Sequence, residues 1–175
     1  MRPPTRKLLL VLHVGTSVGW LGAVAASLAL GVVGLAAEDP GVVRGVYLVL
    51  EPVGWATLVP FSVASLLTGL VQSLGTTWGL VRHYWVLFKL LMNLFATGIL
   101  LLYMQTLAML ADMAAGPGTG AAQLRTPSPV VHAAAAIALL LVALVLSVYK
   151  PRALTRYGQR RSNRSDLLTP AGGVR

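Results

Sequence analysis

Residues Leu8–Leu35 read LLLVLHVGTSVGWLGAVAASLALGVVGL, twenty-eight positions without a formally charged side chain. At about 1.5 Å per residue, a helix of this length exceeds the roughly 30 Å hydrocarbon core of a bilayer. A signal peptide has an apolar region of only about 7 to 15 residues, so the length favours a transmembrane helix over a leader. The stretch therefore predicts an integral membrane protein.

The composition of the whole chain agrees with this class. Hydrophobic residues make up 56% and charged residues 11%, whereas soluble domains carry about 25% charged residues. The chain has no cysteine, which excludes disulfides, thiolate metal sites, iron–sulfur clusters and cysteine nucleophiles. The sequence shows no Ser-His-Asp pattern, phosphate-binding glycine loop or cluster of intramembrane carboxylates, so nothing in it indicates hydrolysis.

Four apolar segments predict an all-α fold, a membrane-embedded bundle of four transmembrane helices. The predicted spans are about 8–35, 53–74, 84–110 and 130–149, within one domain of residues 1–150 that a flexible basic tail, 151–175, follows. Pro60 predicts a kink in the second span. Ser128 is expected to be the N-cap of the fourth helix, with Pro129 at its first helical position. The apolar segment Gly41–Leu50 could lie in the interface or extend the second helix.

The basic residues divide unequally between the two sides of this bundle. Twelve of the fourteen fall on one side: Arg2, Arg6, Lys7, Arg82, Lys89, Lys150, Arg152, Arg156, Arg160, Arg161, Arg164 and Arg175. Only Arg44 and Arg125 fall on the other. The positive-inside rule then predicts a multi-pass protein of the plasma (cytoplasmic) membrane with both termini in the cytoplasm. Trp55 on one side, and Trp78, Tyr84 and Trp85 on the other, are typical of aromatic belts.

The net charge of +9 does not indicate nucleic acid, because the basic tail directly follows a helix and lacks interspersed aromatic residues. Two interpretations of the tail remain. It is either a topology signal alone or a segment that lies on anionic lipid headgroups of the bilayer.

Small residues recur every fourth position along the first helix, at Gly15, Gly19, Ala23, Ser27 and Gly31. Such a ridge lets another helix approach closely. The partner helix is either a neighbour within the bundle, which four short-looped helices favour, or a second copy of the chain in a homodimer.

A second face of the first helix carries His13, Thr16, Ser17 and Trp20, at helical offsets from one another. His13 lies six residues inside Lys7, and Lys89 lies six residues inside His83, so the two side chains are expected at nearly the same depth, about 9 Å in.

Further polar residues are expected around this pair: Asn93 and Thr97 on the third helix, Ser65, Thr68 and Gln72 on the second, and Ser147 on the fourth. Ionisable groups inside a membrane commonly mark a functional site, so the pattern predicts a wet or ligand-filled cavity in the cytoplasmic half. The alternative is purely structural: Lys89 extends to the headgroups, the hydroxyls bond to their own helices and His13 is a satisfied core histidine.

Four stretches of the sequence carry two family resemblances. LHVGTSVGWLG at Leu12–Gly22 and WVLFKLL at Trp85–Leu91 resemble the first and third helices of the CopD-type copper-resistance proteins and the HemJ-type protoporphyrinogen oxidases. LTGLVQSLGTTWGLVRHYWV at Leu67–Val86 and SVYKPR at Ser147–Arg152 are similar to an actinobacterial four-helix integral membrane family of undescribed function, which implies no activity.

The HemJ resemblance implies that His13 and Lys89 are a functional pair, with haem b or a porphyrin as cofactor and His13 as the iron ligand. The expected cofactor-binding set is His13, Lys89, Thr16, Ser17, Trp20, Asn93 and Gln72. The wholly apolar or small stretch Ala23–Val33 departs from the HemJ pattern, which argues against the oxidase reaction itself. His83 should lie about 9 Å shallower than His13, so a bis-histidine haem is not expected. An enzyme is not favoured; if the chain is one, it is a membrane oxidoreductase acting on a porphyrin or quinone-like substrate.

Two alternatives of different classes stay open. Met109, Asp112 and Met113 near the end of the third helix, with His132 at the start of the fourth, offer thioethers and imidazole that favour Cu(I), although methionine at helical spacing is commonly core filling. The other alternative is a non-catalytic assembly subunit that uses the small-residue ridge. The connection Gly116–Gly120, followed by Ala121 and Ala122, is expected to be irregular and unpacked.

Overall fold

The computed structural model describes residues 3–75, 84–118 and 120–149, and every regular element in these ranges is a helix. The order is α1 Pro3–Ala36, α2 Pro40–Val53, a π-helical turn η1 Gly54–Leu58, α3 Val59–Gly75, α4 Tyr84–Ala115, the short α5 Ala121–Leu124 and α6 Ser128–Tyr149. Four stretches of the described chain are long and apolar enough to cross a membrane: Pro3–Ala36, Pro40–Gly75, Tyr84–Ala115 and Ala121–Tyr149. The all-helical, four-span fold predicted from the sequence is confirmed.

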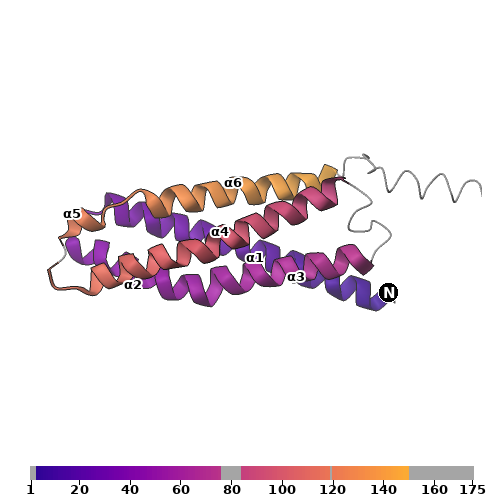
Figure 1. The fold of residues 1–175 in the computed structure, drawn as a ribbon, viewed down its shortest axis with the longest axis horizontal. Helices are drawn as coiled ribbons and strands as arrows, with labels where there is room; N and C mark the ends of the chain where they lie inside the picture. Colours follow the sequence, from indigo (N-terminus) through magenta and orange to yellow (C-terminus); the bar gives the residue numbers. More distant parts are fainter. Residues whose placement is uncertain (1–2, 76–83, 119, 150–175) are drawn as a thin grey trace, which may run out of the picture.

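The four long helical stretches run side by side along one axis (Figure 1). Helix α1 packs against α3 and α6, and α2 packs against α4. The start of α1 and the end of α6 lie at the same end of the bundle, which we call the terminal end, and α5 lies at the opposite end, which we call the α5 end (Figure 1). Trp78, Arg82, His83 and the basic tail 151–175 lie outside the described residues.

The segment Gly41–Leu50 is helical and extends the second span, so the two alternatives left open by the sequence are decided in favour of extension. The Asp39 carboxylate caps α2 by accepting a hydrogen bond from the Gly41 amide at 2.8 Å. Val43, Val46, Tyr47 and Leu50 recur at helical spacing and are all buried. Burial of this stripe compensates for the glycines and the charge that interrupt the apolar sequence.

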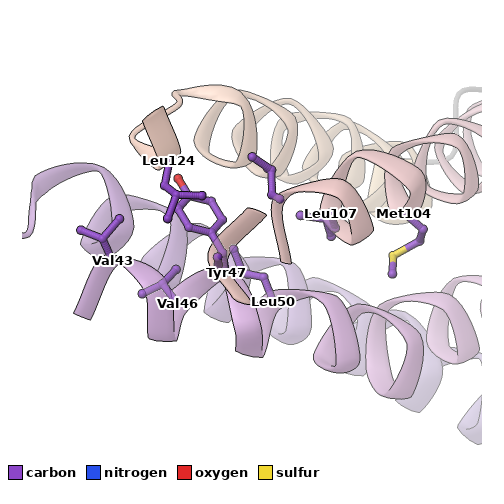
Figure 2. Close-up of a cluster of buried hydrophobic side chains, with 9 residues drawn as sticks. Val43, Val46, Tyr47, Leu50, Met104, Leu107 and Leu124 are labelled. Atoms are coloured by element: carbon purple, nitrogen blue, oxygen red, sulfur yellow. The ribbon is translucent and has the colours of Figure 1, made fainter. Parts of the chain in front are cut away.

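A hydrophobic cluster at the α5 end joins α2, α4 and α5 (Figure 2). The Tyr47 side chain, 1% exposed, extends from α2 toward Leu124 of α5 (Figure 2). The described members of the cluster are Val43, Val46, Tyr47, Leu50, Met104, Leu107, Leu110, Ala114 and Leu124. Leu124 is fully buried, so the connection after α4 is more tightly packed than expected: Ala121 and Ala122 begin a short helix that carries an anchor residue into the cluster.

The second span changes its winding just before Pro60. Residues Gly54–Leu58 form a π-helical turn, in which the Val59 amide bonds to the Gly54 carbonyl. Proline has no amide to donate to the carbonyl four residues earlier, and its ring clashes with that carbonyl. A π turn is a common way for a helix to absorb such an interruption. The irregularity expected at Pro60 therefore takes the form of a widened turn.

The small-residue ridge of α1 packs largely within the chain. A Cβ built on Gly19 would lie 2.9 Å from the Phe61 ring of α3, and one built on Gly31 would lie 3.3 Å from Pro129 of α6. Ser27 is buried and Ala23 packs against the cluster around Trp20. Gly15 has no atom within 4 Å of its built Cβ. The ridge thus serves the neighbouring helices, as the intramolecular alternative requires.

The two basic residues on the sparsely charged side hold helix ends. Arg44 Nη1 donates to the carbonyls of Ala114 at 2.7 Å and Gly116 at 2.8 Å, at the end of α4. Arg125 Nη2 donates to the carbonyls of Ala37 at 2.6 Å and Glu38 at 3.2 Å, just after α1. The last carbonyls of a helix lack amide partners and carry partial negative charge, which a guanidinium neutralises. Both arginines therefore have a structural role.

Helix α6 begins at Ser128, two residues before the start of the predicted span. Ser128 is the first helical residue, and its amide donates to Thr126 Oγ1 at 3.3 Å. The capping role expected of Ser128 therefore falls to Thr126. The Ser128 hydroxyl instead lies 3.2 Å from the Tyr103 hydroxyl of α4, so this serine joins two helices.

Candidate functional site

His13 is held against α3 by two neighbouring residues of that helix. Its Nδ1 lies 3.1 Å from Thr68 Oγ1, and its ring rests on Gly69, whose built Cβ would stand 3.0 Å from Cε1. The Thr68 hydroxyl donates its own proton to the Ala64 carbonyl at 2.6 Å. It is therefore the acceptor toward His13, and the imidazole carries its proton on Nδ1. The lone pair of the neutral ring is then on Nε2.

A second set of hydrogen bonds joins three helices one turn further in. Ser65 Oγ lies 2.9 Å from Ser17 Oγ of α1 and 3.5 Å from Asn93 Nδ2 of α4. Thr97 Oγ1, in turn, lies 3.4 Å from Asn93 Oδ1. Ser65 and Thr97 are buried, and paired polar groups of this kind hold helices together where lipid offers no hydrogen bonds. Ser17, Ser65, Asn93 and Thr97 thus form a series of hydrogen-bonding contacts across three helices.

Lys89 lies on α4 beside this group. Its ammonium donates a hydrogen bond to the Ser147 hydroxyl of α6 and stands 5.9 Å from the centre of the Trp85 ring. The Ser147 hydroxyl in turn donates a hydrogen bond to the Ala143 carbonyl at 2.8 Å. Ser17 and Asn93 both meet Ser65, and His13 and Lys89 each lie four residues before them. The two residues are therefore at about the same level of the bundle.

Other members of the predicted set lie elsewhere. Thr16 Oγ1 donates to the Leu12 carbonyl at 2.9 Å and the His13 carbonyl at 3.1 Å, so this hydroxyl bonds to its own helix. Trp20, 2% exposed, packs with Val24, Leu58 and Ala133 in a separate apolar cluster. Gln72 lies on α3, one turn beyond Thr68.

Thr68, Ser65 and Ser147 stand out in the sequence as polar residues within apolar helices. Gly69 does not, because its role depends on the approach of α1 and has no sequence signal beyond a glycine inside a helix.

A cavity of about 150 Å³ lies between α1, α4 and α6, closer to the α5 end than His13 is. Its lining is almost wholly apolar: Trp20, Val24, Ser27, Leu50, Leu58, Phe95, Ala96, Ile99, Leu100, Tyr103, Leu107, Pro129, His132, Ala133, Ala135, Ala136 and Leu139. Trp20 therefore faces this cavity. The cavity expected beside His13 itself stays a prediction.

The residues suggested as copper ligands lie in different environments. Met109 is 55% exposed, and Met113 packs against the cluster around Tyr47. The His132 ring stacks on Tyr103 with 3.9 Å between ring centres. Within residues 3–75, 84–118 and 120–149, no group of three or more His, Cys, Asp or Glu side chains is placed to hold a metal ion.

No protein-family model matches the chain, and neither a curated protein nor a solved structure is similar to it. The resemblance of the first and third helices to the HemJ and CopD types is therefore untested. The geometry around His13 is the basis for a functional hypothesis.

Proposed function

We propose that this chain is a multi-pass protein of the cytoplasmic membrane whose bundle binds a haem or porphyrin through His13. The observation that carries the proposal is the hydrogen bond between His13 Nδ1 and Thr68 Oγ1. Histidines that bind metals usually donate a hydrogen bond from the N–H of their other ring nitrogen to a fixed acceptor, which sets the tautomer and the ring orientation. Thr68 supplies that acceptor, and Gly69 supplies the room for the ring.

Lys89 supports the same assignment. Its ammonium group is a cation in the same part of the bundle as His13, and the propionates of a haem are anions that such a group can bind. Lysine pairs with carboxylates through short, charge-assisted hydrogen bonds. In this proposal the Lys89 ammonium pairs with a haem propionate, in addition to its contact with Ser147 or in place of it. Ser17, Ser65 and Asn93 form hydrogen bonds to polar atoms beside the porphyrin ring.

The topology proposed for this site places the terminal end in the cytoplasm. Lys89 belongs to that end, and it is one of the twelve basic residues that the sequence assigns to the cytoplasmic side. The basic tail is proposed to lie on anionic headgroups, where each basic residue near the surface contributes about 1 kcal/mol. We do not propose a homodimer through the α1 ridge, because Gly19 and Gly31 already pack against α3 and α6.

The test is the absorption spectrum of the detergent-purified full-length protein, produced with ample haem supply or reconstituted with haem. The proposal expects a Soret band that His13→Ala abolishes. Lys89→Met should weaken haem binding and leave the ligation spectrum recognisable, because the lysine contacts the propionate and not the iron.

A matched pair of threonine variants separates ligand orientation from helix packing. Thr68→Val removes the acceptor of His13 and should lower haem affinity about 10-fold or more, as loss of an outer-shell partner commonly does. Thr57→Val is the control, because the Thr57 hydroxyl donates to the Val53 carbonyl four residues earlier in the same span. Absence of haem absorbance after reconstitution, or a full Soret band in His13→Ala, would refute the proposal and favour an assembly subunit.

A further inference from the structure

The apolar cavity between α1, α4 and α6 opens toward the lipid side of the bundle. Phe95 and Ile99, which line it from α4, are 62% and 41% exposed. Both lie inside the span Tyr84–Ala115, so the surface that they expose faces hydrocarbon and not water. An apolar cavity of about this size stays dry and accepts apolar ligands. The lining therefore matches a hydrocarbon chain in polarity.

The cavity is elongated along the bundle axis. Gly31 of α1 packs on Pro129 and Val130 of α6, which places these residues at one level. Trp20, eleven residues before Gly31 on α1, lies about 16 Å along the axis from that level. Because both Pro129 and Trp20 line the cavity, the space suits an extended chain of about that length better than a compact ligand.

His132 gives one end of this cavity a defined polarity. It lies in the second turn of α6 and lines the cavity together with Tyr103, on which its ring is stacked. Its Nδ1 lies 2.9 Å from the Ser128 carbonyl. A carbonyl oxygen only accepts, so Nδ1 carries the proton and Nε2 of the neutral ring is a hydrogen-bond acceptor. A head group that hydrogen-bonds to Nε2 must be a donor, as a hydroxyl group is and as an ester, ether or ketone is not.

We propose that this cavity binds a long-chain alcohol, with the hydrocarbon chain between α4 and α6 and the hydroxyl donating to Nε2 of His132. The hydroxyl then lies near the start of α6, close to the membrane surface. The chain extends inward past Ala133 and Ala136, whose small side chains leave the space, and ends near Trp20. This site is separate from the one proposed at His13.

The geometry offers a direct measurement, because Trp20 is buried at the inner end of the cavity. The probe is an ω-bromo-dodecanol, added to haem-free full-length protein in detergent, and the readout is tryptophan fluorescence. A bromine at the chain end should quench Trp20 in a saturable manner. The matched probe is the methyl ether of the same alcohol, which has the same chain and cannot donate.

Three variants assign the quenching to the site. Trp20→Phe identifies the part of the signal that comes from Trp20, since the chain has four tryptophans. Ala136→Phe fills the cavity and should abolish saturable quenching. His132→Phe keeps an aromatic ring on Tyr103 and removes the acceptor, so it should weaken binding of the alcohol about 3- to 10-fold, the effect of one hydrogen bond, and leave the ether unchanged.

Two results would overturn the proposal. One is quenching that rises linearly with probe and is equal in Ala136→Phe, which would show contact from the surrounding detergent only. The other is equal affinity for the alcohol and the ether, which would show that His132 does not accept a hydrogen bond from the hydroxyl. If Ala136→Phe fails to fold, Ala133→Leu fills the neighbouring part of the cavity instead. Each of these results is independent of whether His13 binds haem.

Discussion

His13 of α1 lies directly against the backbone of Gly69 in α3. A Cβ built on this glycine would stand 3.0 Å from His13 Cε1 and 3.5 Å from Nδ1. The ring cannot move away without stretching the hydrogen bond between Nδ1 and Thr68 Oγ1. Gly69 and Thr68 together therefore fix where the imidazole lies, one by leaving room and the other by accepting its proton.

Substitution of Gly69 by alanine should displace the imidazole. We expect Gly69→Ala to destabilise the folded protein by about 1–3 kcal/mol, as overpacking of an interior commonly does, and to lower haem affinity if His13 is the ligand. Unfolding in detergent followed by circular dichroism measures the first effect. Gly98→Ala on α4 is the control, because nothing lies within 4 Å of its built Cβ. Equal stability of the two variants would show that α1 adjusts freely at this contact.

Arg44 gives a prediction about the α5 end. Its guanidinium donates to two carbonyls at the end of α4, and hydrogen bonds from a charged group contribute about 1.5–3 kcal/mol. Arg44→Ala should therefore lower the unfolding free energy by an amount in that range. Arg6→Ala removes the same charge from an exposed position on α1 and should change stability by less than about 0.5 kcal/mol. If the two variants unfold alike, the Arg44 contacts contribute nothing to stability.

Gly54 and Met104 should be energetically coupled. A Cβ built on Gly54 would lie 2.8 Å from both Sδ and Cε of Met104, and both residues are buried. Gly54→Ala should destabilise the protein, because the methionine must leave its place in the cluster (Figure 2). Met104→Ala alone should cost about 2–5 kcal/mol by leaving a cavity.

In the double variant the new methyl group occupies part of that cavity, so the sum of the single effects should exceed the measured effect by at least 0.5 kcal/mol. Chemical denaturation of the four proteins completes this cycle. Additive values would mean that Met104 moves aside without loss of packing, and the close approach of η1 and α4 would then not depend on the glycine.

The sequence predicts the spans of this fold better than it predicts the contacts between them. A run such as Leu8–Leu35 can cross a bilayer for reasons of length and polarity alone. The level placement of His13 and Lys89 follows equally from helical rise. The sequence alone left open whether the segment that forms α2 extends the second span, because its glycines and Arg44 interrupt the apolar pattern. Its helical state depends on burial of Val43 and Tyr47 against α4 and α5.

The candidate site was predicted only in part, because the sequence identifies polar residues in apolar helices but not the gaps between helices. Ser65 and Thr68 are recognisable as polar residues in an apolar helix, so their meeting with Ser17 and His13 could be expected. The cavity at Trp20 could not be expected, because it arises where Ala133 and Ala136 of α6 face α4. Alanine within a helix is too common to indicate a gap between helices, which depends on the placement of the neighbouring helix.

The last prediction concerns orientation in the membrane. The start of α1 and the end of α6 lie at one end of the bundle (Figure 1), so a reporter fused after Arg175 should be active on the same side as one fused at the N-terminus. The twelve basic residues of the terminal side predict that this side is the cytoplasm.

Arg44 and Arg125, the two basic residues on the opposite side, bind carbonyls at the ends of α4 and α1. The double variant Arg44→Gln/Arg125→Gln should therefore be less stable but keep the same orientation, measured with paired cytoplasmic and extracytoplasmic reporters. Activity of the Arg175 fusion outside the cytoplasm would contradict the four-span topology.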